Sequence, residues 1–182
     1  MILFKNIRIS VISFIGMAGV FVALPLPPLE AENDGYLYSK AVEAAKEGRQ
    51  DAAYAYYNAI LRLPHSKYHK AALFAKAEYF FLSGDTRSSK SAWNVFLEQY
   101  PDIPETLFAL VNCYYIARKD NDLADVEAIK QRIVQSRQIS LIFRKSKDFH
   151  FTSPFFRHYR AVYSIDKIEF MIDDIPFETI LY

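Results

Sequence analysis

The residues of this chain that could carry chemistry are few and lie far apart. His65 and His69 are four positions apart, a spacing that places two imidazoles on one face of a helix, as in zinc sites. No cysteine or carboxylate accompanies them, and His65 directly follows Pro64, so it precedes the helix that we expect there. The sequence therefore predicts no metal site.

A nucleophilic active site is also not indicated. Cys113 is the only cysteine, so it cannot form an internal disulfide, and its neighbours Val111, Tyr114 and Tyr115 favour burial. Neither a histidine nor an acid stands close to it to activate a thiolate. The chain also lacks a G-x-S-x-G motif and a glycine-rich phosphate loop. We expect a protein that is not an enzyme and that needs no cofactor.

The elements of the chain are instead organised by a repeat. Gly48 and Gly84 are 36 positions apart (84 − 48), and each lies between two helical patterns that end at a proline. A period of this length predicts stacked helical hairpins, in which glycine allows the turn and an aromatic residue fills the space between units. The aligned pairs are Ala53 with Ser89, Tyr57 with Trp93, Ile60 with Phe96 and Leu61 with Leu97, and Pro64 and Pro101 close the units.

The segment from Gly48 to Pro64 reads G-x-x-x-x-A-x-x-x-Y-x-x-I-L-x-x-P, which resembles the second helix of tetratricopeptide repeats. The run that starts at Tyr56 and the ending F-L-E-Q-Y-P look like exported members of that family in bacterial envelopes. Those members are the outer-membrane barrel-assembly lipoproteins and the periplasmic Tol-Pal coordinator of cell division. The resemblance covers residues 34–134, and Lys76 departs from it because a leucine is usual there.

The expected fold class is mainly α, a tetratricopeptide-like array of about three units over residues 32–138. Apolar spacing predicts helices at 34–46, 51–62, 67–82, 86–100, 104–117 and 123–138. Asn33 or Asp34 is expected to cap the first helix and Ser66 the third, and Asn121 replaces glycine in the third turn.

Residues 139–182 are expected to form a basic linker and a short β-hairpin. Residues 140–143 and 149–151 look extended, and residues 159–164 and 167–172 alternate, with Ile168, Phe170 and Ile172 on one face. Asp173 and Asp174 supply a turn before a return strand at 175–181. An isolated hairpin is marginal in water, so it must pack on the helices, a partner or another copy.

Residues 1–31 resemble a targeting segment. Lys5 and Arg8 precede an apolar run that prolines interrupt, and Ala31 offers a cleavage site. The segment is either a cleaved signal peptide or an uncleaved anchor in the inner membrane. Both alternatives place the remainder outside the cytoplasm, in the periplasm.

The distribution of charged residues along the chain indicates which classes of partner it can bind. Removing residues 1–31 takes away two basic residues and one acid, so the 22 basic and 21 acidic side chains fall to 20 of each. A nucleic-acid binder normally carries a basic excess, so no nucleic acid is expected. Residues 129–161 hold eight basic residues against one acid, whereas residues 166–182 hold five acids against one lysine. The basic stretch either binds anionic lipid or cell-wall polymer or attracts the acidic hairpin.

In the family that the chain resembles, the first helices of the units line a concave groove. The matching positions are Tyr38, Val42 and Lys46, then Phe74, Glu78 and Phe81, then Ala109, Cys113 and Ile116. The resemblance implies that this groove binds a protein or peptide of the cell envelope. The alternative is that the aromatic tail at 149–159 fills it. We therefore expect a non-catalytic exported scaffold, or alternatively a membrane-surface or cell-wall binding module.

Overall fold

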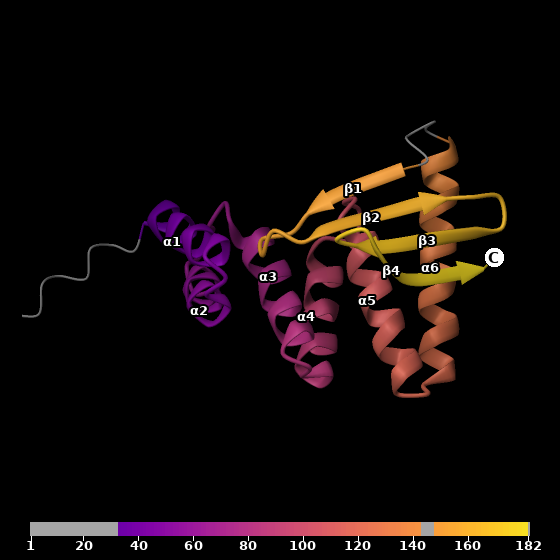
Figure 1. The fold of residues 1–182 in the computed structure, drawn as a ribbon, viewed down its shortest axis with the longest axis horizontal. Coiled ribbons are helices and arrows are strands. Elements are labelled where there is room, and N and C mark those ends of the chain that lie inside the picture. Colours follow the sequence, from indigo (N-terminus) through magenta and orange to yellow (C-terminus); the bar gives the residue numbers. More distant parts are fainter. Residues whose placement is uncertain (1–32, 143–147, 182) are drawn as a thin grey trace, which may run out of the picture. The chain divides into compact units, whose positions relative to one another are not determined.

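In the computed structural model, which describes residues 33–142 and 148–181, helices are followed by one antiparallel sheet (Figure 1). The helices are α1 (Asp34–Lys46), α2 (Gln50–Ile60), α3 (His69–Leu82), α4 (Thr86–Gln99), α5 (Thr106–Lys119) and α6 (Leu123–Ile142). The strands are β1 (Asp148–Thr152), β2 (His158–Tyr163), β3 (Lys167–Ile172) and β4 (Ile175–Leu181). The expected targeting segment, residues 1–31, lies outside the described residues.

The helix boundaries follow the predicted ones closely. α1 has the predicted bounds, and Asn33 caps it by accepting a hydrogen bond from the Gly35 amide at 2.9 Å. Ser66 was predicted to cap α3, but the N-cap position is Tyr68. The hydroxyl of Ser66 accepts a hydrogen bond from the amide of Tyr68 at 3.2 Å and donates one to Asp34 at 3.0 Å. That hydrogen bond ties the turn between the first two helix pairs to the start of α1.

The three turns that join α1 to α2, α3 to α4 and α5 to α6 share one backbone feature. Gly48 has φ 72°, Gly84 has φ 80° and Asn121 has φ 57°, all in the left-handed region. Glycine adopts this conformation without strain, and asparagine is among the few other residues that visit it routinely. The predicted role of these three residues in ending the first helix of each pair is confirmed.

The residues that the repeat aligns lie inside the helix packing. Tyr57 and Trp93 are fully buried, and so are the small residues Ala53 and Ser89. Ser89 donates a hydrogen bond to the carbonyl of Ala77 at 3.1 Å, so its hydroxyl is satisfied at this close approach of α3 and α4. Each helix packs against the one that follows it in sequence.

The carboxy-terminal part is a sheet of four strands in the order β1-β2-β3-β4, all antiparallel. The prediction of a hairpin alone is therefore corrected, although β3 and β4 have the predicted bounds and Asp173 and Asp174 form their turn, with φ 52° and 61°. The prediction of extended structure is wrong for residues 140–142, because they continue α6.

The sheet packs on the helices and shares their core. Ile168, Phe170 and Ile172 face inward from β3, as their alternation predicts. The ring of Phe108 on α5 stacks against Phe149 and Phe151 on β1, with centroids 5.5 and 5.9 Å apart.

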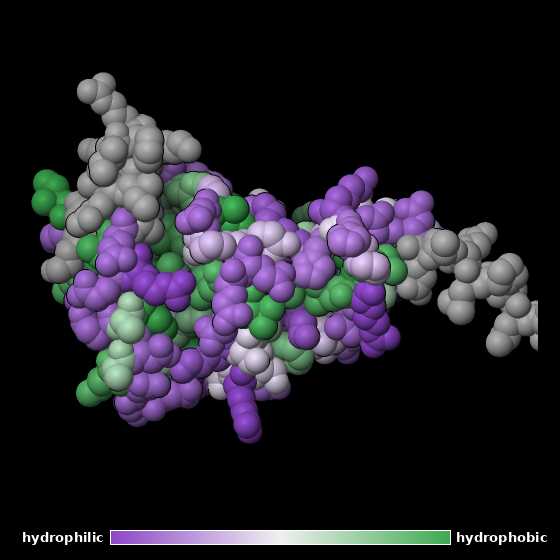
Figure 2. Space-filling view, turned by 180° about the vertical axis from the view of Figure 1, so that it is seen from behind, coloured by the Kyte–Doolittle hydropathy of each residue, from purple (hydrophilic) through white to green (hydrophobic). Residues whose placement is uncertain are grey.

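On the surface shown in Figure 2, from the side opposite to Figure 1, hydrophilic and hydrophobic residues are mixed in small areas. None of the helices in the described part of the chain has the length and apolar composition needed to cross a bilayer.

Candidate functional site

The candidate site is the face that α1, α3 and α5 present to the sheet. Phe74 on α3 meets the edges of Phe151 and Tyr159, with ring centroids 4.9 and 5.9 Å away. Phe81, two turns further along α3, meets Phe177 on β4 at 5.9 Å. The aromatic tail therefore covers this part of the face, as one of the two alternatives from the sequence predicts.

Glu78 lies between these two phenylalanines and is fully buried. The hydroxyl of Tyr159 donates a hydrogen bond to its Oε1 at 2.8 Å. Burial raises the pKa of Glu78 to about 7, although the hydrogen bond from Tyr159 acts in the opposite direction. Burial also raises the pKa of Tyr159 well above its ordinary value. The sequence suggested that Glu78 would set the register of a partner, but it contacts the chain's own sheet instead.

The loop between β1 and β2 is fixed to the first helix pair. Tyr57 on α2 donates a hydrogen bond to the carbonyl of Pro154 at 3.0 Å, and its ring meets that of Phe155. Ser153 accepts hydrogen bonds from the amides of Phe155 and Arg157 at 3.2 and 3.1 Å, which closes the loop on itself. These contacts hold the β1–β2 end of the sheet at the first helix pair.

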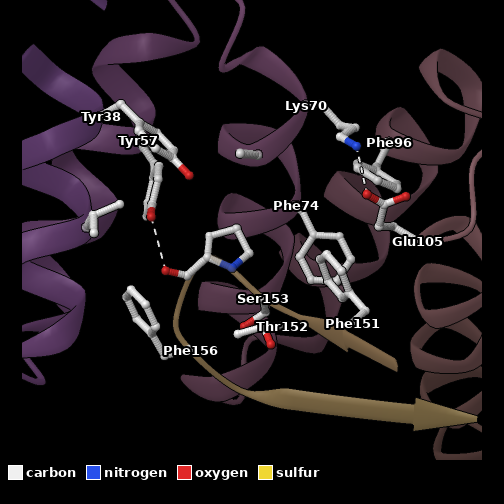
Figure 3. Close-up of a pocket in the computed structure, with 13 residues that line it drawn as sticks. Tyr38, Tyr57, Lys70, Phe74, Phe96, Glu105, Phe151, Thr152, Ser153 and Phe156 are labelled. Carbon is white, nitrogen blue, oxygen red and sulfur yellow. Dashed lines mark hydrogen bonds and ion pairs between the residues drawn. The ribbon is translucent and has the colours of Figure 1, made fainter. Parts of the chain in front are cut away.

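A pocket of about 280 Å³ remains open beside this loop (Figure 3). Its walls come from α1 and α3, from Tyr57 on α2 and Phe96 on α4, from Glu105 just before α5, and from the end of β1 with the loop after it. Lys70 Nζ lies 2.7 Å from Glu105 Oε1. The lining residues are Tyr38, Val42, Tyr57, Lys70, Ala71, Phe74, Phe96, Glu105, Phe151, Thr152, Ser153, Pro154 and Phe156. We call it the first-helix pocket.

The rings around the first-helix pocket are held by one another. Tyr38 stacks on Tyr68 with centroids 4.0 Å apart, and Phe74 meets Phe96 edge to face at 5.4 Å. The hydroxyl of Tyr38 points toward the pocket in Figure 3 and makes no hydrogen bond to a described residue. These walls suit an apolar side chain with a polar group near it.

Six of the predicted site residues divide into two groups. Tyr38, Val42 and Phe74 line the first-helix pocket, and the ammonium of Lys46 stands 5.5 Å from the ring centre of Phe156, which also lines it. The sheet covers the other two, Glu78 and Phe81.

Cys113 does not belong to an open groove. Only 2% of its surface is exposed, and burial raises the pKa of its thiol to about 12. The prediction that Cys113 contacts a partner is corrected, because α5 is packed on both sides by α4 and α6 and is also covered by the sheet. The expectation of burial from its apolar neighbours is confirmed.

Several residues of the site were not predicted. Lys70 and Glu105 occupy the starts of two successive units. Their separation of about one period in the sequence could have indicated that they lie side by side. For residues 153–156 of the loop, the only feature of the sequence that suggested a place in the site was their aromatic content. The contact between Tyr57 and Pro154 joins positions 97 apart, which no local pattern indicates.

The charged segments of the carboxy-terminal part meet within the chain. Arg157, from the basic stretch, pairs with Asp173 of the acidic hairpin. Arg118 on α5 pairs with Glu178 on β4 at 2.5 Å. The pair of Arg157 and Asp173 agrees with the alternative in which the acidic hairpin attracts the basic stretch, whereas Arg118 lies outside that stretch.

The histidines do not form a metal site in the described part of the chain. His65 lies in the turn before α3, with φ 65°, and His69 Nδ1 is 3.4 Å from the hydroxyl of Tyr100. No cluster of three or more histidine, cysteine or acidic side chains suited to a metal occurs among residues 33–142 and 148–181.

The chain was also compared with known proteins. No protein-family model matches it, and no curated protein matches its sequence.

Proposed function

We propose that this chain is a non-catalytic, exported scaffold of the tetratricopeptide-like class that binds another protein of the bacterial cell envelope. The observation that carries the proposal is the first-helix pocket, which stays open on a face otherwise covered by the sheet. Its walls include several aromatic rings and Val42, which are typical of recognition by apolar contact. Export rests on the composition of residues 1–31.

The chemistry of the pocket supports binding rather than catalysis. Its charged lining residues, Lys70 and Glu105, neutralise one another at 2.7 Å. Within residues 33–142 and 148–181, the carboxyl whose pKa is raised most is that of Glu78, which is sealed beneath the sheet and cannot reach a bound molecule. An anchor side chain of a partner would gain free energy there by burying apolar surface.

Photocrosslinking in cells tests the proposal. A benzophenone amino acid replaces Val42 in the pocket, and in a matched variant it replaces Val95, which is exposed on α4 and does not line the pocket. The proposal predicts a crosslinked envelope protein from position 42 and none from position 95. Equal products from both positions, or none from either, would contradict it.

Export is tested separately by fractionation and amino-terminal sequencing of the isolated protein. A periplasmic chain that starts near residue 32 fits a cleaved signal peptide. A membrane-bound chain that keeps residues 1–31 fits an anchor, and recovery in the cytoplasmic fraction would refute export.

A further inference from the structure

We infer that the outer edge of β1 is the docking site for an extended segment of the partner protein, which pairs with β1 and inserts one apolar side chain into the first-helix pocket. The inference rests on the proposed function and deepens it, because it states the form that the bound protein takes. It follows from the sheet order, the hydrogen-bond register and the position of the pocket.

The two edges of the sheet differ. The order β1-β2-β3-β4 makes β1 and β4 the outer strands. β4 contains Pro176, and its register with β3 shifts between Phe170 and Met171, two features that obstruct further pairing. β1 pairs with β2 over five residues without a shift and contains no proline. β1 is therefore the edge that is suited to accept another strand.

The register shows which backbone groups of β1 point outward. Ser153 donates its amide to the carbonyl of Arg157 at 2.9 Å, so its backbone faces β2. Hydrogen-bonding direction alternates along an antiparallel strand, so Phe151 also faces β2. The amides and carbonyls of His150 and Thr152 then face away from β2. They present two donors and two acceptors to an incoming strand.

Side-chain direction connects this edge to the pocket. Phe151 points toward the helices, where it meets Phe74 and Phe108. In an antiparallel pair, the residue opposite Phe151 points to the same face of the sheet. Phe151 and Thr152 border the first-helix pocket, as Figure 3 shows. A segment paired with β1 therefore directs that residue toward the pocket.

The size and charge of the pocket define the inserted residue. A volume of about 280 Å³ lies below the range of roughly 300–1,000 Å³ found for drug-sized ligands, so it suits one side chain. Lys70 and Glu105 already pair with one another, which leaves no charge for a charged residue to neutralise. An aromatic or large aliphatic residue fits best. The chain itself shows the same kind of contact, because β1 places the aromatic side chain of Phe151 against Phe74 on the helices.

Selection from a library of random heptapeptides displayed on phage, against the full chain, supplies the probes. We expect the selected peptides to contain an aromatic or large aliphatic residue within a β-forming sequence. Each peptide is then resynthesised with single N-methyl groups along its backbone. Methylation at alternate positions should weaken binding about tenfold, because it removes hydrogen bonds to β1, and the intervening positions should tolerate it.

Protein variants locate the site. Val42→Arg fills the pocket and should weaken binding at least about tenfold, whereas the exposed Val95→Arg should bind like the wild type. His150→Pro removes one outward amide at an edge, where proline is tolerated, and should also weaken binding. Thermal unfolding verifies that each variant is folded. The methylation series changes only the peptide, so its result does not depend on the folding of a variant.

Several results would overturn the inference. They are a library that yields no binder, methylation effects without alternation, binding unaffected by Val42→Arg, and sedimentation that shows a dimer of the wild type which His150→Pro abolishes. If Val42 crosslinks an envelope protein in cells while methylation effects do not alternate, the proposed scaffold function stands and only the strand-pairing mode fails.

Discussion

The hydroxyl of Tyr159 on β2 donates a 2.8 Å hydrogen bond to the carboxyl of Glu78 on α3, and both residues are buried. This contact joins positions 81 apart and fixes the sheet on the face of the helices. A buried carboxyl is costly when charged, so the same contact makes the fold sensitive to pH.

The first prediction concerns the pH dependence of stability. The pKa of Glu78 is about 7 in the folded chain and near its ordinary value of 4.5 in the unfolded chain, so the folded state holds the proton more tightly between these values. The contribution of Glu78 to the free energy of unfolding is complete below pH 4.5 and is lost as the pH rises toward 7. The expected loss is roughly 3 kcal/mol.

Glu78→Gln is the matched variant for this prediction, because glutamine can still accept the hydrogen bond from Tyr159 but cannot titrate. Urea unfolding from pH 4 to pH 8 should give a difference between variant and wild type that grows in favour of the variant as the pH rises. A difference that stays constant over this range would show that Glu78 has an ordinary pKa.

The second prediction concerns the anchor of the β1–β2 loop. Tyr57→Phe removes the hydrogen bond to the carbonyl of Pro154 but keeps the ring packed on Phe155. The free energy of unfolding should fall by about 1–2 kcal/mol, since a half-buried carbonyl loses its partner. Tyr36→Phe, at a tyrosine that is 60% exposed, is the control and should change stability by less than about 0.5 kcal/mol. Equal effects of the two substitutions would show that the loop is not fixed there.

The third prediction concerns the turns. Gly84 has φ 80°, and a Cβ added there meets no atom within 4 Å, so Gly84→Ala costs only backbone strain. We expect a loss of about 1–2 kcal/mol in chemical unfolding. Ser91→Ala, at an exposed position of α4, should be neutral or slightly stabilising because alanine favours a helix. A Gly84→Ala variant as stable as the wild type would argue against the left-handed turn.

The fourth prediction concerns thiol reactivity. Cys113 is buried and the pKa of its thiol is raised to about 12, so it should react with a disulfide reagent at pH 8 only when the chain opens. The rate in native buffer should therefore be far below the rate in denaturant, and it should fall with every stabilising substitution. Rapid native labelling would place Cys113 at an accessible surface.

The sequence was sufficient for the elements that depend on local patterns. Gly48 and Gly84, the buried aromatic residues that follow them, and the alternation of Ile168 and Phe170 each mark a helix pair or a strand within a short window. The pairing of β1 with β2 was missed because Pro154 and the irregular loop around it interrupt the period-2 pattern.

The candidate site was only partly predictable. Tyr38 and Val42 follow from their helix positions, because they line the pocket directly. The covering of Glu78 and Phe81 depends on contacts with Tyr159 and Phe177, whose position is set by the packing of the whole sheet. Two alternatives therefore remained open at the level of sequence, and only three-dimensional packing distinguishes an open groove from a covered one.

The most direct measurement of the central claim, that the sheet covers the helical face within the same chain, is nuclear Overhauser spectroscopy of the full chain with labelled aromatic residues. The structure predicts cross-peaks from the ring of Phe74 to the rings of Phe151 and Tyr159, whose centroids lie 4.9 and 5.9 Å away. Cross-peaks from Phe74 to Trp93 and Phe96 alone would show that the sheet does not pack there, and would contradict the account.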